Sequence, residues 1–155
     1  MTLFDMGELE LEILEPMSSS FERIEHFLMK VDGDFYTPLS VRVDIETYSN
    51  KLFKFAVNIF LISHGDDVAH AGIYVDLEGD EIFISNFAVL RKCSRQKIGN
   101  YLLQKIEDYV SSIGVDLIRL EADCEADALF EFYTKNGFRC TQENDKCIYL
   151  SLLPI

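Results

Sequence analysis

The stretch from Glu81 to Ala122 constrains the fold of this chain more than any other part of its sequence. Residues 81–90 form an apolar run typical of a β-strand, and residues 98–113 repeat apolar side chains at helical spacing. Residues 116–122 again have the composition of a strand. Strands joined through a helix pair in parallel by a right-handed crossover, so we predict a sheet that contains a parallel strand pair.

Shorter elements are predicted on both sides of this strand–helix–strand unit. Strands are expected at residues 8–14, 55–63, 68–76, 138–140 and 146–152, helices at 18–30, 44–54 and 126–135, and a loop at 33–40. The sequence contains neither an internal repeat nor a flexible linker. We therefore predict one α+β (mixed α/β) domain over residues 1–155, because this length and 48% hydrophobic content suffice for a packed core.

The chain carries a formal charge of −13, yet four of its fourteen Lys and Arg residues lie between Arg91 and Lys97. This basic turn directly precedes the helix expected at residues 98–113. A helix start exposes unpaired N–H groups and the positive end of the helix dipole, and it binds anions readily. The turn thus favours a phosphate-bearing ligand, and the alternative is a solvated basic loop.

The remaining composition excludes several classes of protein. The negative net charge repels nucleic acid, so we predict no nucleic-acid partner. No apolar run approaches the about 20 residues of a membrane span, and the acidic N-terminus is unlike a secretory signal. The four cysteines lack paired metal-ligand spacing, so we expect reduced thiols in a cytoplasmic protein, with neither a disulfide framework nor a metal site.

Two motifs carry a resemblance to a known family. Phe132-Tyr133 followed by Gly137-Phe138, after a strand ending in Leu120-Glu121, resembles the C-terminal motif of the GCN5-related N-acetyltransferases, the GNAT superfamily. The basic turn is similar to the superfamily's pyrophosphate loop, Arg/Gln-x-x-Gly-x-Gly/Ala, with Gly99 in the last position. The resemblance covers residues 56–138. It implies a GNAT-like fold, with a central, mostly antiparallel sheet of six to seven strands flanked by about four helices.

The resemblance also implies acetyl-CoA as the co-substrate and indicates the residues that hold it. The end of one strand would bond the pantetheine arm like an added strand, and the N–H groups of the turn would bind the pyrophosphate. The implied residues are Phe87, Ala88 and Val89 for the arm and Ser94, Arg95, Gln96, Lys97, Ile98, Gly99 and Asn100 for the pyrophosphate. Lys97 stands where the pattern has its first glycine, so it must adopt glycine's backbone geometry or offer its ammonium to phosphate. Core packing alone also explains the apolar strand and helix.

Two residues are implied as catalytic. Tyr133 would be the general acid that protonates the departing thiolate, since a phenol and an alkyl thiol have comparable pKa values. The alternative is a core tyrosine with a structural hydrogen bond. Glu121 lies twelve residues before Tyr133, a spacing similar to the Glu/Tyr pair of the ribosomal-protein N-acetyltransferases, and would be the general base. Glu81, Asp123 and His70 are the other candidates, although His70 is better explained as a structural histidine.

The resemblance, together with the basic turn, implies an acetyl-CoA-dependent N-acetyltransferase that transfers the acetyl group directly to a primary amine in a ternary complex. The acceptor, a small molecule or a peptide, would be selected by residues 31–43 and 123–125. A non-catalytic acyl-CoA-binding or interaction module is the alternative, because Ser94, Lys97 and Ala126 depart from the family pattern. A third possibility is a small oligomerising domain, and apolar residues near the C-terminus could support a homodimer.

Overall fold

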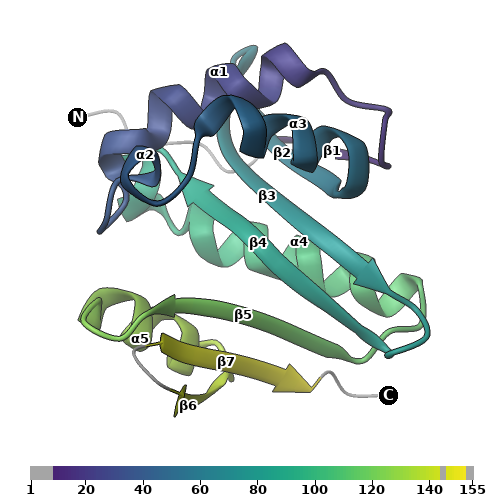
Figure 1. The fold of residues 1–155 in the computed structure, drawn as a ribbon, viewed down its shortest axis with the longest axis vertical. Helices are drawn as coiled ribbons and strands as arrows, with labels where there is room; N and C mark the ends of the chain where they lie inside the picture. The colour runs from purple at the N-terminus through teal and green to yellow at the C-terminus, as the bar shows by residue number, and fades with distance from the viewer. Residues whose placement is uncertain (1–8, 144–145, 153–155) are drawn as a thin grey trace.

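The computed structural model describes residues 9–143 and 146–152, and its elements follow the predicted order (Figure 1). The strands are β1 (Glu10–Leu14), β2 (Val57–Ser63), β3 (Asp66–Asp76), β4 (Glu81–Val89), β5 (Leu117–Asp123), β6 (Arg139–Glu143) and β7 (Lys146–Leu152). The helices are α1 (Phe21–Val31), α2 (Leu39–Arg42), α3 (Ile45–Phe55), α4 (Ile98–Ser112) and α5 (Asp127–Lys135). Two 3₁₀ helices span Asp32–Asp34 and Arg91–Gln96.

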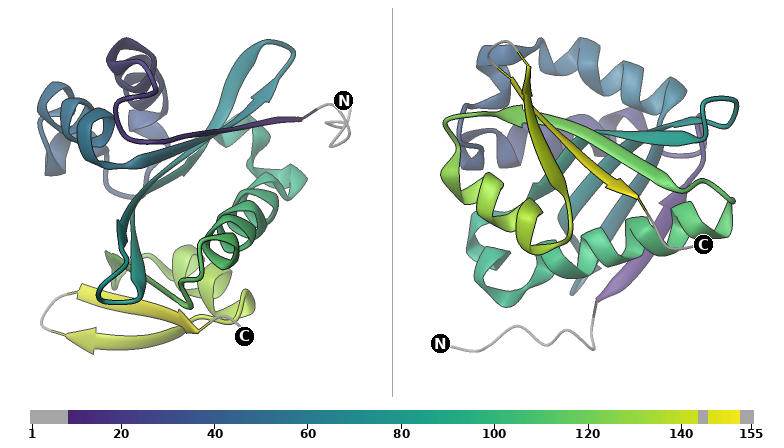
Figure 2. Two further views of the ribbon diagram at one scale, coloured as in Figure 1. Left: turned by 90° about the vertical axis from the view of Figure 1, so that its right-hand side faces the viewer. Right: turned by 90° about the horizontal axis from the view of Figure 1, so that it is seen from below.

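The seven strands form one sheet in the order β1-β2-β3-β4-β5-β7-β6. Every neighbouring pair is antiparallel except β4 and β5, which pair in parallel through α4. Helices α1 and α3 cover one face of the sheet, and α4 and α5 cover the other (Figure 2). The predicted α+β class, the mostly antiparallel sheet and its parallel pair are therefore confirmed.

Two short helical segments differ from the predicted elements. Helix α2 lies partly within the expected loop, and with it the described residues form five α-helices. It follows Pro38, whose ring restricts φ to values suited to a helix start, and it buries Leu39. The basic turn is itself a 3₁₀ helix. Both segments span too few turns for a helical hydrophobic repeat to be read from the sequence.

Strands β4 and β5 pair over only four residues and then diverge (Figure 1). The paired segments are Glu81–Ile84 and Leu117–Leu120. Immediately afterwards β4 contains a β-bulge at Ser85, because Ile84 and Asn86 pair with consecutive residues of β3. Beyond the bulge, β4 stays paired with β3 and β5 stays paired with β7. No described strand pairs with the β5-facing edge of β4 from Ser85 to Val89, so its backbone groups are available to a ligand.

A buried polar chain links the three strands beneath α1 and α3. His70 on β3 is fully buried, and its Nε2 lies 2.8 Å from the Asn58 side-chain oxygen on β2. The Asn58 amide donates to the carbonyl oxygens of Leu52 and Ala56, so its oxygen accepts from the imidazole N–H. The Asn86 amide on β4 donates to Nδ1 of His70 at 2.9 Å. Both ring nitrogens are thus satisfied by a neutral imidazole, which agrees with the interpretation of His70 as structural.

We expect this histidine to make folding sensitive to acid. Burial, and secondarily the nearby Arg23 cation, lowers the pKa of His70 from 6.5 to about 3. Between these values only the unfolded chain takes up the proton, so the stabilisation is complete above the unfolded pKa and declines as the pH falls toward about 3. The decline should be about 1.4 kcal/mol for each pH unit below the unfolded value.

Urea unfolding of the wild type and of His70→Gln, between about pH 7 and about pH 5, measures this effect. The stability advantage of the wild type should shrink by about 2 kcal/mol over that interval. The exposed His26→Gln is the matched substitution control. An advantage that does not change with pH would show that the folded His70 accepts a proton normally.

Candidate functional site

Lys97 adopts the backbone conformation of the glycine that it replaces in the predicted pyrophosphate loop. Its φ is 60° and its ψ is 22°, in the left-handed region, at the junction between the 3₁₀ helix and α4. The Lys97 carbonyl accepts the first α-helical bond from the N–H of Tyr101 at 3.0 Å. The preceding N–H groups, from Ile98 to Asn100, therefore lie at the start of α4 as an anion-binding helix start requires. The Lys97 side chain is exposed at the same place.

One cation of the basic turn is held by the loop that follows α1. The Arg91 backbone N–H donates to the Asp34 carboxylate at 2.9 Å, and the Arg91 Nε lies 3.9 Å from the other oxygen. This contact anchors the start of the turn to the 3₁₀ helix Asp32–Asp34. The backbone of residues 94–96 belongs to the second 3₁₀ helix, whereas the side chains of Ser94, Arg95 and Gln96 lie outside the described part.

The predicted pantetheine strand lies against the start of α4 and against α5. Ala88 is buried, and Phe87 and Val89 are half-buried on the opposite face of β4. The Phe87 ring lies 5.8 Å from the Phe132 ring and 6.2 Å from the Tyr133 ring. A Cβ added at Gly99 would lie 3.4 Å from the Phe132 ring, so Gly99 lets the first turn of α4 approach α5 closely. The structure thus brings together the strand end, the helix start and the predicted acid.

Tyr133 lies within a cluster of aromatic rings. It is 4% exposed, and its ring centre lies 5.5 Å from that of Phe138 and 5.1 Å from that of Tyr149. Burial, and to a lesser extent the neighbouring Tyr149, raises the pKa of Tyr133 well above its usual value of 10. The phenol therefore stays protonated at neutral pH. Among the described residues, none forms a hydrogen bond with its hydroxyl.

Glu121 and Tyr133 lie on opposite faces of the sheet. Glu121 is exposed on β5 and points away from the face of its buried neighbour Leu120. Leu120 pairs with Tyr149, against which Tyr133 packs. The Glu121 carboxylate therefore does not meet the Tyr133 hydroxyl directly, and it lies where β5 has diverged from β4.

The other candidate bases are placed differently. Asp123 shares the exposed face of β5 with Glu121, and its carboxylate accepts a hydrogen bond from the Thr37 hydroxyl at 3.4 Å. This bond joins the two segments predicted to select the acceptor. Glu81 lies opposite Leu117, at the end where β4 and β5 are still paired. It is therefore remote from the open part of the sheet.

Sequence reasoning missed one polar pair at the bulge. The Tyr48 hydroxyl on α3 lies 2.5 Å from the Ser85 hydroxyl. Burial raises the pKa of Tyr48 to about 12, and the Ser85 contact opposes that shift. The helical spacing of Tyr48 predicted only its place on α3. Its partner depends on the bulge, which has no signal in the sequence.

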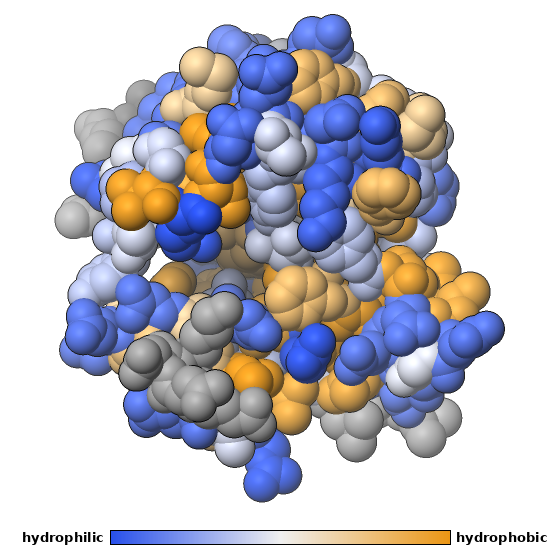
Figure 3. Space-filling view, in the orientation of Figure 1, coloured by the Kyte–Doolittle hydropathy of each residue, from blue (hydrophilic) through white to orange (hydrophobic). Residues whose placement is uncertain are grey.

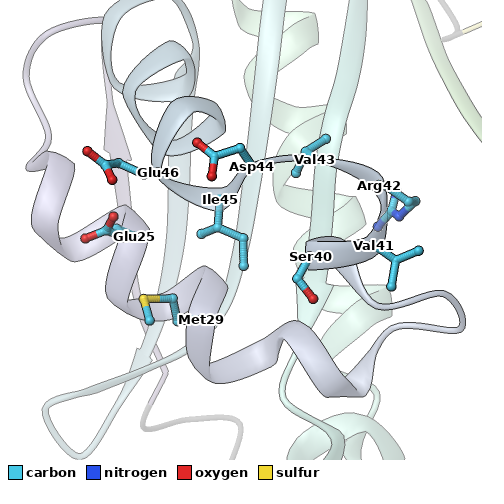
Figure 4. Close-up of a pocket in the computed structure, with 9 residues that line it drawn as sticks. All are labelled: Glu25, Met29, Ser40, Val41, Arg42, Val43, Asp44, Ile45 and Glu46. Atoms are coloured by element: carbon cyan, nitrogen blue, oxygen red, sulfur yellow. The ribbon is translucent and has the colours of Figure 1, made fainter.

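The molecular surface has two hollows of different kinds. One lies between the upper and lower halves of the sheet, where β4 and β5 diverge (Figure 3). The other is a groove of about 680 Å³ between α1, α2 and the start of α3, and Glu25 and Met29 point toward it from α1 (Figure 4). Residues 40–43 of the segment predicted to select the acceptor line this groove, but none of the residues predicted to hold acetyl-CoA or to act as acid or base does so. We therefore place the candidate site at the opening between β4 and β5.

Comparison with known proteins identifies the class of this chain. The sequence profile of the acetyltransferase (GNAT) family matches residues 22–138, and the chain belongs to this family. The predicted membership of the GNAT superfamily is thereby confirmed. A search of curated protein sequences found no match.

Solved structures of low sequence identity share the fold. The ribosomal-protein-S18-alanine N-acetyltransferase from Escherichia coli is 22% identical over 95% of this chain and 94% of its own, with a TM-score of 0.71. The PaiA N-acetyltransferase from Thermoplasma acidophilum, solved with coenzyme A, is 15% identical over 92% of this chain and 99% of its own, with a TM-score of 0.74. A GNAT acetyltransferase from Elizabethkingia anophelis, solved with acetyl-CoA, is 14% identical over 94% and 99%, with a TM-score of 0.69.

Within residues 9–143 and 146–152, no helix is long and apolar enough to cross a membrane. The same residues include no group of three or more His, Cys, Asp or Glu side chains arranged to hold a metal ion.

The left-handed conformation of Lys97 predicts a gain in stability on substitution by glycine. The left-handed conformation costs a residue with a Cβ about 1–2 kcal/mol of folding free energy, whereas for glycine the only cost is its greater loss of chain entropy. Lys97→Gly should therefore be about 1 kcal/mol more stable than Lys97→Ala, which removes the same charge but keeps a Cβ. Thermal or urea unfolding of both variants tests this. Equal stabilities would contradict the left-handed conformation.

Proposed function

We propose that this protein is an acetyl-CoA-dependent N-acetyltransferase that transfers the acetyl group directly to a primary amine within a ternary complex. The observation that carries the proposal is the convergence of three segments where β4 and β5 diverge. The strand end at Phe87, the start of α4 at Lys97 and the buried Tyr133 meet there, which supports the roles that the resemblance implies for them.

The residues present fit acetyl-CoA. The open edge of β4 over Phe87, Ala88 and Val89 offers backbone groups to an extended amide chain. The N–H groups from residue 95 to residue 100, with the exposed Lys97 ammonium, offer a positively charged place for a pyrophosphate. Two structural neighbours were solved with coenzyme A or acetyl-CoA, which supports the same ligand here.

Acid and base chemistry would come from the two faces of the sheet. Acetyl-CoA supplies the thioester that is cleaved. Tyr133 would donate its phenolic proton to the departing thiolate, since its raised pKa keeps that proton in place until a strong base forms. Glu121 would accept a proton from the acceptor ammonium, directly or through water, which frees the amine to attack. Their placement on opposite faces fits a reaction in which thiol and amine approach from different sides.

The acceptor is inferred from charge and from the fold neighbours. Glu121 and Asp123 are exposed beside the segment that contains Thr37, in a chain of net charge −13. Carboxylates at the entrance attract a cationic amine. The Escherichia coli neighbour acts on an alanine of ribosomal protein S18. We infer an amine acceptor that is either a small molecule or a peptide, while the cytoplasmic location and the homodimer expected from the sequence stay predictions.

A second candidate is an acyl-CoA-binding module without turnover. Ala126 occupies the N-cap of α5 and provides no side-chain hydrogen bond to the helix that carries Tyr133. Calorimetry with acetyl-CoA, run beside an assay of thiol release with mixed amines, separates the two functions. Binding without thiol release from any amine would establish the module.

Removal of the Tyr133 hydroxyl should reduce turnover without loss of binding. Tyr133→Phe keeps the ring in its aromatic cluster and removes only the proton donor. We expect kcat to fall by about 10²–10⁴-fold and the affinity for acetyl-CoA to stay unchanged. Tyr109→Phe, at a tyrosine whose hydroxyl bonds Glu15 at 3.1 Å, is the matched control. Thiol release and calorimetry give the two quantities, and an unchanged kcat would remove Tyr133 from the acid role.

The base can be assigned by comparison of two neighbouring carboxylates. Glu121→Gln should lower kcat by about 10²-fold, because an amide cannot accept the ammonium proton. Asp123→Asn should lower kcat much less, because the Asp123 carboxylate already accepts a hydrogen bond from the Thr37 hydroxyl. Both variants are isosteric, lie on one exposed face and are measured in the same assay. A larger loss for Asp123→Asn would transfer the base role to that residue.

A further inference from the structure

Three of the four cysteines gather at the end of the sheet that carries α5. Cys124 directly follows β5, Cys147 lies on β7, and their sulfur atoms are 2.6 Å apart. Cys140 on β6 pairs with Tyr149 of β7, and Tyr149 is two residues beyond Cys147 on that strand. The fourth, Cys93, lies in the 3₁₀ helix before α4 and is buried.

Strand pairing brings the two close thiols together from distant parts of the sequence. Cys147 is the partner of Ala122 in the antiparallel β5–β7 pair, and Cys124 is two residues beyond Ala122. The two cysteines are therefore diagonal neighbours rather than direct partners in the register, and it is the 2.6 Å between their sulfur atoms that shows how closely the thiols approach. The two sulfur atoms need to move only a few tenths of an ångström to reach the bond length of about 2.0 Å.

We propose that Cys124 and Cys147 are a reversible modification site that forms an intramolecular disulfide by exchange with small-molecule disulfides. Cys124 belongs to the segment 123–125 that is predicted to select the acceptor, but neither cysteine is among the residues that we assign to acetyl-CoA binding or to proton transfer. The pair is separated from Tyr133 by the Tyr149 ring, which packs against Tyr133 at 5.1 Å.

The exchange runs in two balanced steps. The Cys124 thiolate attacks one sulfur of the small disulfide, so that a mixed disulfide forms and one small thiolate leaves with the Cys124 proton. Cys147 then loses its proton and attacks the Cys124 sulfur, and the second small thiol departs with that proton. Two protein thiols are oxidised, and one small disulfide is reduced to two thiols.

Exposure assigns the order of the two cysteines. Cys124 is partly exposed, whereas Cys147 is only 8% exposed, so an oxidant reaches Cys124 first. The contact with Cys124, and then burial, raises the pKa of Cys147, which suits it to resolve the mixed disulfide rather than to start the reaction. The rate should therefore rise with pH.

The bond would close a loop from Cys124 to Cys147 that contains α5 and β6. This loop carries Tyr133 and is held to β5 through β7. A cross-link of this kind reduces the freedom of the unfolded chain, so the oxidised protein should have a higher Tm than the reduced protein.

Incubation of the full chain with oxidised glutathione tests the proposal. We expect two of the four thiols to be lost, an intact mass lower by two hydrogen atoms, a Cys124–Cys147 peptide after digestion, and full reversal by dithiothreitol. The Cys93→Ser and Cys140→Ser variants should form the same Cys124–Cys147 bridge as the wild type. Cys124→Ser should form no bridge, and Cys147→Ser should accumulate glutathione on Cys124.

Equal Tm values of the reduced variants and the reduced wild type would show that the serine substitutions leave the fold intact. If the Tm values differ, the peptide map of the oxidised wild type alone tests the proposal. A bridge that involves Cys140 or Cys93, a disulfide-linked dimer, or retention of all four thiols would overturn the proposal. None of these readouts depends on acetyl transfer.

Discussion

The early end of the parallel pairing between β4 and β5 is the constraint on which the rest of this structure depends. A continuous pair would leave no backbone edge inside the sheet, and the two strands would simply form core. The bulge at Ser85 turns β4 away after four paired residues, while β3 and β7 keep each strand fixed on its other side. The sheet therefore opens at its centre without loss of its outer pairing, and the start of α4 and the rings of α5 meet at that opening.

The two halves of the sheet are held rigid by different means. Beneath α1 and α3, the bonded chain through His70 connects three strands, and Arg23 on α1 binds the Asp67 carboxylate with two hydrogen bonds of 2.9 and 2.7 Å. The Arg23 guanidinium also lies 3.9 Å from the centre of the Phe60 ring. The other half relies on aromatic packing around Tyr133. The polar network through His70 holds β4 in place on one side of the opening. The backbone groups of β4 that face the opening can therefore stay unpaired, although unpaired polar groups are costly to bury.

The sequence predicted those parts of the fold that depend on local periodicity. The strand–helix–strand unit from Glu81 to Ala122 and the order of the remaining elements follow from apolar spacing and turn residues. The bulge at Ser85 could not be predicted, because it arises from how three strands share one register. The placement of Glu121 and Tyr133 on opposite faces of the sheet could not be predicted either. Strand alternation gives the face of Glu121 relative to Leu120, but only the three-dimensional packing shows on which face α5 lies.

Charge is distributed across the opening in the way that a phosphate-bearing donor and a cationic acceptor require. Arg91 and Lys97 lie at the two ends of the 3₁₀ helix that precedes α4. Asp34 neutralises part of the charge of Arg91, and the exposed Lys97 lies beside the N–H groups of the helix start. Carboxylates gather on the exposed face of β5, at Glu121 and Asp123. Lys97 adopts a left-handed conformation that is unfavourable for a residue with a Cβ, and it adds a positive charge where the helix dipole already favours anions. If Lys97 binds the pyrophosphate as we propose, this positive charge offsets the repulsion between a phosphate and a chain of net charge −13, which compensates for the strained backbone.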